Sequence, residues 1–214
     1  MSTSAKLASN RCSAIWPTEI VGPIRWPNEE ARVWVAQLLT DTRVAVVVIY
    51  GSAVRAVTES NDVDLLLVAD TEPAYAPPLD VDLHWVDAAQ VDSAVAAGDE
   101  VLGWGLRFGI PLVDREGIWA RLIERWGDLL PFPSAAAADE RARRATTAAE
   151  GLRADGDCEA ADEVLLAALT QRARARLIRA GIYPLSRPEL PDQLVELGDV
   201  DLARQLTDLL NARI

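Results

Sequence analysis

The sequence is poor in the side chains that bind metals through nitrogen or sulfur. It contains one histidine, His84, and two cysteines, Cys12 and Cys158. The cysteines lie far apart and lack the short spacing of a metal-ligand pair, so we expect free thiols in a reducing compartment. Cysteine usage therefore favours a cytoplasmic protein without a disulfide framework.

Positive charge is also scarce. Lys6 is the only lysine, and 33 acidic against 21 basic residues give a net charge of −12. Such a balance argues against a non-specific grip on nucleic acid, which needs a basic surface. The arginine bias is typical of a GC-rich bacterial genome.

Long apolar runs are missing as well. No stretch approaches the ~18 residues that a membrane span requires. The first residues, Met1 to Lys6, are not followed by the apolar segment of a secretory signal. We therefore expect no membrane contact.

The composition nevertheless supports a packed core, because hydrophobic residues make up 50% of the 214 positions. Valine and tryptophan are common early in the chain, and alanine, arginine and glutamate replace them later. We expect an α+β domain over residues 1–115, with an extended arm over 1–27, and a helical domain over 116–214.

Two apolar stretches separated by a glycine-serine turn carry the clearest chemical signal. Residues 44–50 predict a strand buried on both faces, and Gly51-Ser52 follows it. A second strand begins near Asp62 and Asp64, whose alternation places both carboxylates on one face. Paired carboxylates on a rigid strand can bridge two magnesium ions, and a Gly-Ser turn that opens a helix offers N–H groups and a hydroxyl to phosphate.

A third alternating strand is predicted over residues 80–86. It places Asp80, Asp82 and His84 on one face. If this strand lies beside the second one, Asp82 completes a cluster of three carboxylates, with Asp80 as the rival candidate. We interpret the lone His84 as a structural residue.

Taken together, Gly51-Ser52, Asp62-Val63-Asp64 and Val81-Asp82-Leu83 resemble the nucleotidyltransferase superfamily of the DNA polymerase β type. The chain is most similar to its small bacterial members, the minimal and kanamycin-type nucleotidyltransferases. The resemblance covers roughly residues 28–87. It implies an α+β fold, with a nucleotidyltransferase-type mixed sheet flanked by helices and an antiparallel helical bundle after it.

The resemblance also implies a reaction and a set of metal ligands. The family transfers a nucleoside monophosphate from a nucleoside triphosphate (NTP) to a hydroxyl acceptor and releases pyrophosphate. Asp62 and Asp64 would then hold two Mg²⁺ ions. Asp82 would bind one of these two, the catalytic ion. On this reading the three aspartates are both the catalytic residues and the metal ligands.

Phosphate binding is expected from Gly51, Ser52 and Arg55. The sequence departs from the family pattern at two neighbouring positions, where Ala56 stands for a common glycine and Asn61 for a common serine. Neither change touches a metal ligand. Because of these changes two roles of the Arg55 side chain stay open: it either contacts phosphate or forms an ion pair on the surface.

The second half of the chain predicts long helices joined by short turns, over about 135–154, 158–180, 189–197 and 200–212. Arg172, Arg176 and Arg179 share one helix face, which we interpret as solvated and ion-paired. Antibiotic-modifying family members take a general base from their helical half. Here four glutamates are available for that role, and none matches a motif: Glu124, Glu150, Glu159 and Glu163.

Two functions from different classes remain open. The first is an active nucleotidyltransferase acting on an unknown acceptor, either a small hydroxyl compound or a protein, with nucleic acid disfavoured by the acidic surface. The second is a nucleotide-binding, antitoxin-like interaction protein that modifies or grips a partner protein. A homodimer is compatible with either.

Overall fold

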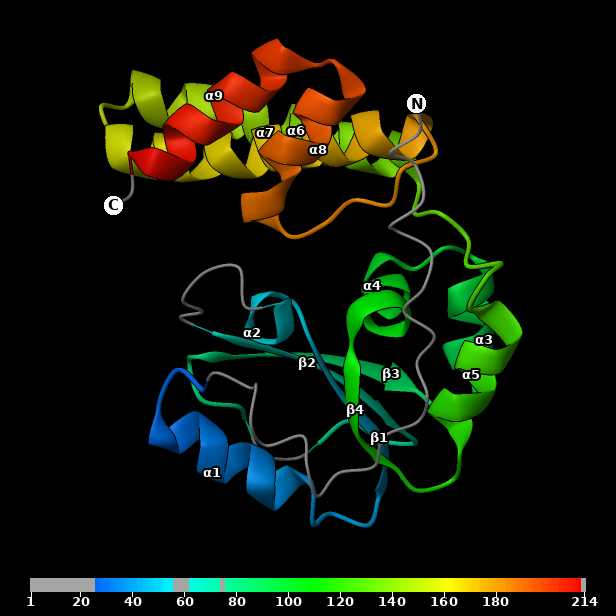
Figure 1. Ribbon diagram of the computed structural model, residues 1–214. Coiled ribbons are helices and arrows are strands. Elements are labelled where there is room, and N and C mark those ends of the chain that lie inside the picture. Colours follow the sequence, from blue (N-terminus) through cyan, green and yellow to red (C-terminus); the bar gives the residue numbers. More distant parts are fainter. Residues whose placement is uncertain (1–25, 56–61, 74–75, 213–214) are drawn as a thin grey trace.

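The computed structural model describes residues 26–55, 62–73 and 76–212, apart from the side chain of Arg55. It has two parts, a sheet half that runs to α5 and a helical half that runs from α6 to α9 (Figure 1). The predicted N-terminal arm over 1–27 lies almost wholly outside the described residues.

The sheet half is built on four strands: β1 (Val44–Tyr50), β2 (Val63–Ala69), β3 (Val81–Asp87) and β4 (Ile110–Asp114). Their order is β3-β2-β1-β4. β1 pairs antiparallel with both β2 and β4, whereas β2 and β3 run parallel. The expected mixed sheet is thus confirmed, and Pro111 sits on an edge strand, where its missing N–H is tolerated.

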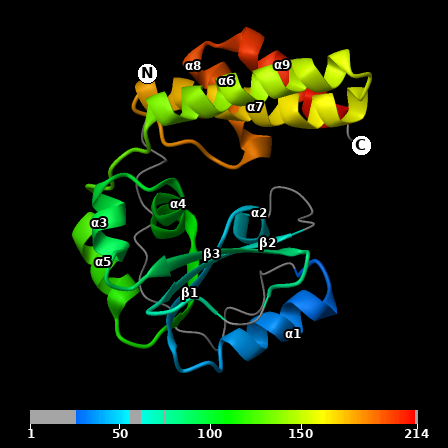
Figure 2. The same ribbon diagram turned by 180° about the vertical axis from the view of Figure 1, so that it is seen from behind.

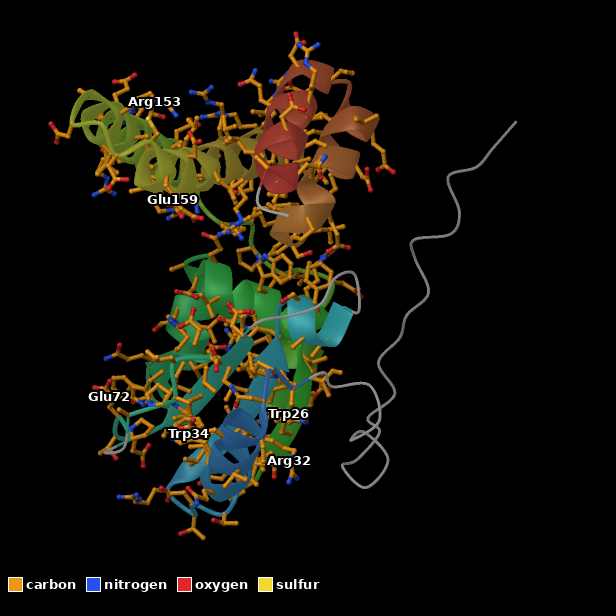
Figure 3. The ribbon with its side chains drawn as sticks, turned by 90° about the vertical axis from the view of Figure 1, so that its left-hand side faces the viewer. Trp26, Arg32, Trp34, Glu72, Arg153 and Glu159 are labelled. Carbon is orange, nitrogen blue, oxygen red and sulfur yellow. The ribbon has the colours of Figure 1, made fainter. Side chains whose placement is uncertain are left out.

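One face of the sheet is covered by helix α1 (Glu29–Leu38). Asn28 begins the helix by accepting a hydrogen bond from the Ala31 N–H at 2.8 Å. Trp34 and Leu38 then pack on the odd-numbered residues of β2. In Figure 3, Trp34 extends from this helix and Trp26 lies near it; both belong to the same core.

The other face is covered by α3 (Val91–Ala96), α4 (Glu100–Phe108) and α5 (Ile118–Trp126). Trp119 and Leu122 of α5 belong to the same buried cluster as Val48 and Leu66 of the sheet. The sheet half therefore includes α5, which the expected boundary at residue 115 assigns to the helical domain. Helix α3 has no counterpart in the sequence-based expectation.

The helical half consists of α6 (Ala135–Ala154), α7 (Cys158–Arg179), a 3₁₀ turn η1 (Arg187–Glu189), α8 (Leu190–Leu197) and α9 (Val200–Asn211). α6 and α7 form a long hairpin, and α8 and α9 pack on α7 through leucines such as Leu177 and Leu194 (Figures 1 and 2). The predicted helical bundle is confirmed.

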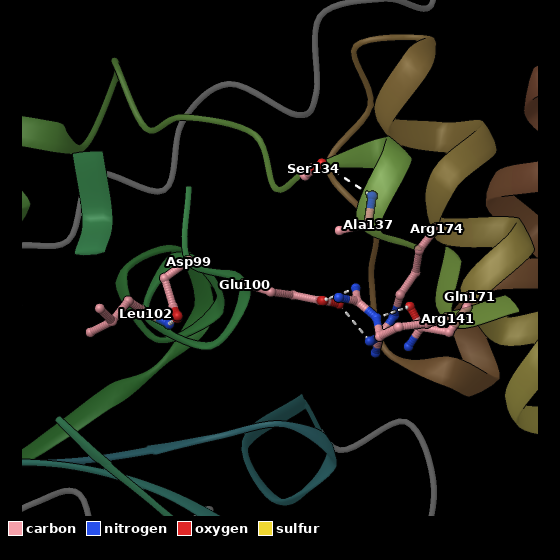
Figure 4. Close-up of polar contacts among 8 residues, drawn as sticks. All are labelled: Asp99, Glu100, Leu102, Ser134, Ala137, Arg141, Gln171 and Arg174. Carbon is pink, nitrogen blue, oxygen red and sulfur yellow. Dashed lines mark hydrogen bonds and ion pairs between the residues drawn. The ribbon is translucent and has the colours of Figure 1, made fainter. Parts of the chain in front are cut away.

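Helix α4 is the contact point between the halves. The carboxylate of Glu100, at the start of α4, accepts two hydrogen bonds from the helical half. One comes from Nη1 of Arg174 on α7 at 2.6 Å, and the other from Nη2 of Arg141 on α6 at 2.7 Å (Figure 4). Further along α4, Gly103 lies under the buried Tyr183, so close that a Cβ at this position would come within 2.0 Å of the tyrosine oxygen. The small residue is what permits this approach.

Alanine substitutions at two helical glycines should separate this packing effect from helix propensity. Gly151 in α6 is exposed and a Cβ there would meet nothing within 4 Å, so Gly151→Ala should raise the free energy of unfolding by up to ~1 kcal/mol. Gly103→Ala should instead lower it by roughly 1–3 kcal/mol, because the Tyr183 ring moves only as a unit and packs against Phe108 and Phe132. Denaturant unfolding of both variants measures the difference; equal stabilisation would show that the halves do not pack this closely.

Candidate functional site

The three predicted aspartates lie where β2 and β3 begin. The parallel register pairs Asp64 directly with Asp82. Asp62 is exposed and lies one residue before β2, and Asp82 is exposed on β3. The rival Asp80 precedes β3 and accepts a hydrogen bond from the side chain of Asn28. The register therefore brings Asp82, rather than Asp80, beside Asp64.

Gly51 closes the turn after β1 against this cluster. Its φ is +73°, in the left-handed region that glycine occupies without a steric penalty. A Cβ at this position would lie 1.9 Å from Asp64 Oδ2. Two constraints therefore favour glycine at position 51. The backbone conformation there disfavours other residues, and the Asp64 carboxylate fills the space that a side chain would need.

The environment of Asp64 disfavours its charged form. Burial raises the pKa of its carboxyl to about 7, and the negative charges of Asp62 and Asp82 push in the same direction. Arg174 and Arg187 of the helical half act in the opposite direction. Burial and the two neighbouring carboxylates outweigh the two arginines, so the charged form of Asp64 is disfavoured on balance.

The chemistry of this cluster suits a hard cation. Its side chains offer only carboxylate oxygens, the ligands that Mg²⁺ prefers. Within the described residues, however, no three His, Cys, Asp or Glu side chains stand close enough together to hold a metal ion. Burial, and after it repulsion by Asp62 and Asp82, raises the pKa of Asp64. A bound cation would offset this repulsion, which otherwise opposes the convergence of the three carboxylates. The donor set fits Mg²⁺ on these grounds.

The predicted phosphate-binding residues surround the same turn. Ser52 begins the short helix α2 (Ser52–Arg55), directly after Gly51. Arg55 ends this helix, and its side chain lies outside the described part of the chain, so its role stays a prediction. Two surface hollows of about 330 and 490 Å³ are lined by residues other than the three aspartates.

Two arginines of the helical half that the sequence did not single out, Arg174 and Arg187, lower the pKa of Asp64. The helix face that the sequence did single out pairs elsewhere, Arg176 with Asp199 and Arg179 with Asp139. That expectation of ion pairs is confirmed for these two arginines. The sequence could not single out Arg174, because its partner Glu100 lies on another helix, 74 positions away along the chain.

The four candidate general bases are spread over three helices: Glu124 lies on α5, Glu150 on α6, and Glu159 and Glu163 on α7. Figure 3 shows Glu159 with Arg153 at the end of the α6–α7 hairpin. We assign none of the four to the cluster.

The dual constraint on Gly51 can be tested against a glycine that has only one of them. Gly181 has a φ of +72°, and a Cβ there would meet nothing within 4 Å. Gly181→Ala should therefore cost about 1 kcal/mol of stability from backbone strain alone. Gly51→Ala should cost roughly 2–4 kcal/mol, since it adds the clash with Asp64. Equal losses in denaturant unfolding would mean that the Asp64 carboxylate does not occupy this space.

The raised pKa of Asp64 predicts a pH dependence of stability. Between about pH 4 and 7 the folded state holds a proton that the unfolded state, whose carboxyl titrates near 3.8, has released. The free energy of unfolding therefore falls as the pH rises through this window. Asp64→Asn removes this effect, so its stability relative to wild type should increase by roughly 2–4 kcal/mol from pH 4 to pH 8.

Urea unfolding in the presence of a chelator checks this expectation. Asp128→Asn removes an exposed carboxylate at the end of α5 instead and serves as the charge-matched control. A constant difference between Asp64→Asn and wild type across the pH range would contradict the assignment.

Comparison with known proteins gives likenesses to solved structures only. No family model and no curated protein matches the chain. Among solved structures it is similar to a nucleotidyltransferase-like protein from Exiguobacterium sibiricum 255-15, with a TM-score of 0.41 and 19% identity over 85% of this chain and 66% of that one. The chain thus spans slightly less than two-thirds of that protein's length. A likeness of this extent leaves the function to the chemistry of the site.

Proposed function

We propose that the protein is a metal-dependent nucleotidyltransferase, which transfers a nucleoside monophosphate from an NTP to a hydroxyl acceptor and releases pyrophosphate. The observation that carries the proposal is the register that pairs Asp64 with Asp82 while the Gly51 backbone closes against Asp64. Carboxylates at the start of two adjacent strands, next to a Gly-Ser turn, are the parts that the resembled family uses.

Each part has a role in this proposal. Asp62, Asp64 and Asp82 would hold two Mg²⁺ ions, whose positive charge stabilises the attacking and leaving oxygens of an in-line displacement. Gly51 and Ser52 would hold the β- and γ-phosphates. We expect Arg55 to assist them.

The reaction itself is a substitution at phosphorus. The acceptor hydroxyl attacks the α-phosphorus, the bond from that phosphorus to the bridging oxygen of the β-phosphate breaks, and pyrophosphate leaves. The hydroxyl proton goes to a base, for which the exposed Asp82 is our candidate. The packed strands hold Asp64 and Asp82 at fixed positions, which reduces the reorganisation that this step requires.

The acceptor belongs to the proposal as a class only, a hydroxyl group on a small molecule or on a protein. Among the described residues, no helix has both the length and the hydropathy to cross a membrane. We place the reaction in the cytoplasm of a bacterium on the basis of the composition.

Calorimetric titration with each of the four NTPs, with and without Mg²⁺, tests the proposal. Wild type should bind at least one of them in a Mg²⁺-dependent manner. Asp62→Asn/Asp64→Asn should weaken that binding at least ~100-fold, because two charged contacts are lost. Asp70→Asn/Asp128→Asn changes the net charge equally at exposed positions outside the cluster and should bind as wild type does. Equal binding by both double variants would contradict the site, and no binding by wild type would contradict the function.

A further inference from the structure

The helical half carries a hollow of about 490 Å³ where its two longest helices meet. The lining residues come from α6 and α7, which pack side by side along the hairpin (Figures 1 and 2). They are Arg143, Arg144, Thr146, Thr147 and Glu150 of α6 and Arg172 of α7. Pockets for small ligands measure about 300–1,000 Å³, so the hollow has room for a small molecule.

Positive charge dominates this lining. Three guanidinium groups and one carboxylate, that of Glu150, line the hollow of a chain whose net charge is −12. Arg143 and Arg144 share the carboxylate of Glu140, so even with this residue included the arginines exceed the glutamates by one. The contact of Arg144 is made at 3.6 Å, longer than an ordinary hydrogen bond, and its N–H donors stay available.

Arg172 is the unpaired member of a helix face whose other arginines are paired. Arg176 binds Asp199 and Arg179 binds Asp139. Arg172 makes no hydrogen bond or ion pair with any of the residues that the structure describes. The expected ion pair therefore does not form there within the described chain, and the five N–H donors of Arg172 are available to a ligand in the hollow.

The remaining lining residues add hydrogen-bonding groups. Thr146 donates its hydroxyl to the Ala142 carbonyl at 2.9 Å, whereas the exposed Thr147 has no such partner among the described residues and can donate to an anion. Glu150 forms no ion pair within the described part of the chain, although three arginines line the same hollow. Its carboxylate can accept hydrogen bonds from a hydroxyl group. The lining thus suits a ligand with an anionic end and a hydroxyl-bearing end.

We propose that this hollow binds a phosphomonoester, with its phosphate on the arginines and Thr147 and a hydroxyl group of its organic part on Glu150. Phosphate presents oxygens in several directions, which matches guanidinium donors from two helices, whereas a carboxylate presents two oxygens in one plane. The lining includes none of the three aspartates, and the inference is independent of the proposed function.

Calorimetric titration with glycerol 3-phosphate tests the site. A chelator in the buffer excludes binding through metal ions at the aspartates. Wild type should bind this probe, and Arg172→Gln should weaken binding at least about tenfold through the loss of a charged hydrogen bond. Arg176→Gln is the matched control, because it removes an arginine of the same helix from outside the hollow. It should bind within about twofold of wild type.

The role of Glu150 is measured by a ratio of affinities. Glycerol 3-phosphate offers hydroxyl groups to this carboxylate, and inorganic phosphate lacks the organic part that carries them. Glu150→Ala should therefore lower the preference for glycerol 3-phosphate over inorganic phosphate about fivefold, the loss of a hydrogen bond. Glu196→Ala removes an exposed carboxylate of α8 outside the hollow and should leave this ratio unchanged.

Three results would overturn the inference. Equal losses in Arg172→Gln and Arg176→Gln would show binding to diffuse surface charge. Wild type that does not bind glycerol 3-phosphate would show that the hollow is no phosphate site, and equally tight binding of succinate would show that it takes carboxylates. Asp62→Asn/Asp64→Asn should bind glycerol 3-phosphate as wild type does, so failure of the proposed function leaves this site in place.

Discussion

The register between β2 and β3 is the constraint on which the site depends. Residues of even number on β2 face α3 to α5, and residues of odd number face α1, so each face of the strand belongs to a different core. A slip by one residue would exchange the two faces and turn Asp64 toward the apolar side occupied by Leu65 and Leu67. Burying a carboxylate there without a partner would cost several kcal/mol. The apolar residues on both sides thus fix the position of the one polar residue between them.

This constraint explains how the sheet tolerates acidic residues at its start. Asp64 is only partly exposed, and its charge is opposed by burial and by two neighbouring carboxylates. Two features act in its favour. Gly51 leaves room for the carboxylate, and the charges of Arg174 and Arg187 lower its pKa. A bound divalent cation would stabilise the charged form, which these surroundings otherwise disfavour.

Much of this fold could be predicted from local pattern. The buried run ending in Tyr50 and the Gly51-Ser52 turn after it each signal an element within a few neighbouring residues, and both form where expected. Helix α3 spans only Val91–Ala96, too short for a helical period to emerge, and Gln90 at its start makes no side-chain cap. The packing of α5 on the sheet is not visible in the local pattern for a related reason, because the burial of Trp119 depends on strands that come earlier in the chain.

The candidate site shows the same division between local and tertiary information. A Gly-Ser turn and alternating aspartates are local patterns, and the acidic residues of the candidate site are predicted from them. The two arginines that bind Glu100 could not be singled out in this way. Arg174 belongs to a run in which arginine recurs, and helical spacing groups Arg172, Arg176 and Arg179 on one face. What distinguishes Arg174 is Glu100, which is 74 positions away in the sequence.

Under the proposed function, an acidic protein binds an anionic substrate, and the two repel each other at long range. With a net charge of −12, the long-range field of the chain repels a nucleoside triphosphate, which weakens steering at low ionic strength. Salt screens this field over about 10 Å, whereas charged contacts at hydrogen-bond distance persist. The contacts of Arg141 and Arg174 with Glu100 act at that short range. The chain can therefore keep an acidic surface elsewhere, provided that the few cations at the junction of its two halves are fixed in place.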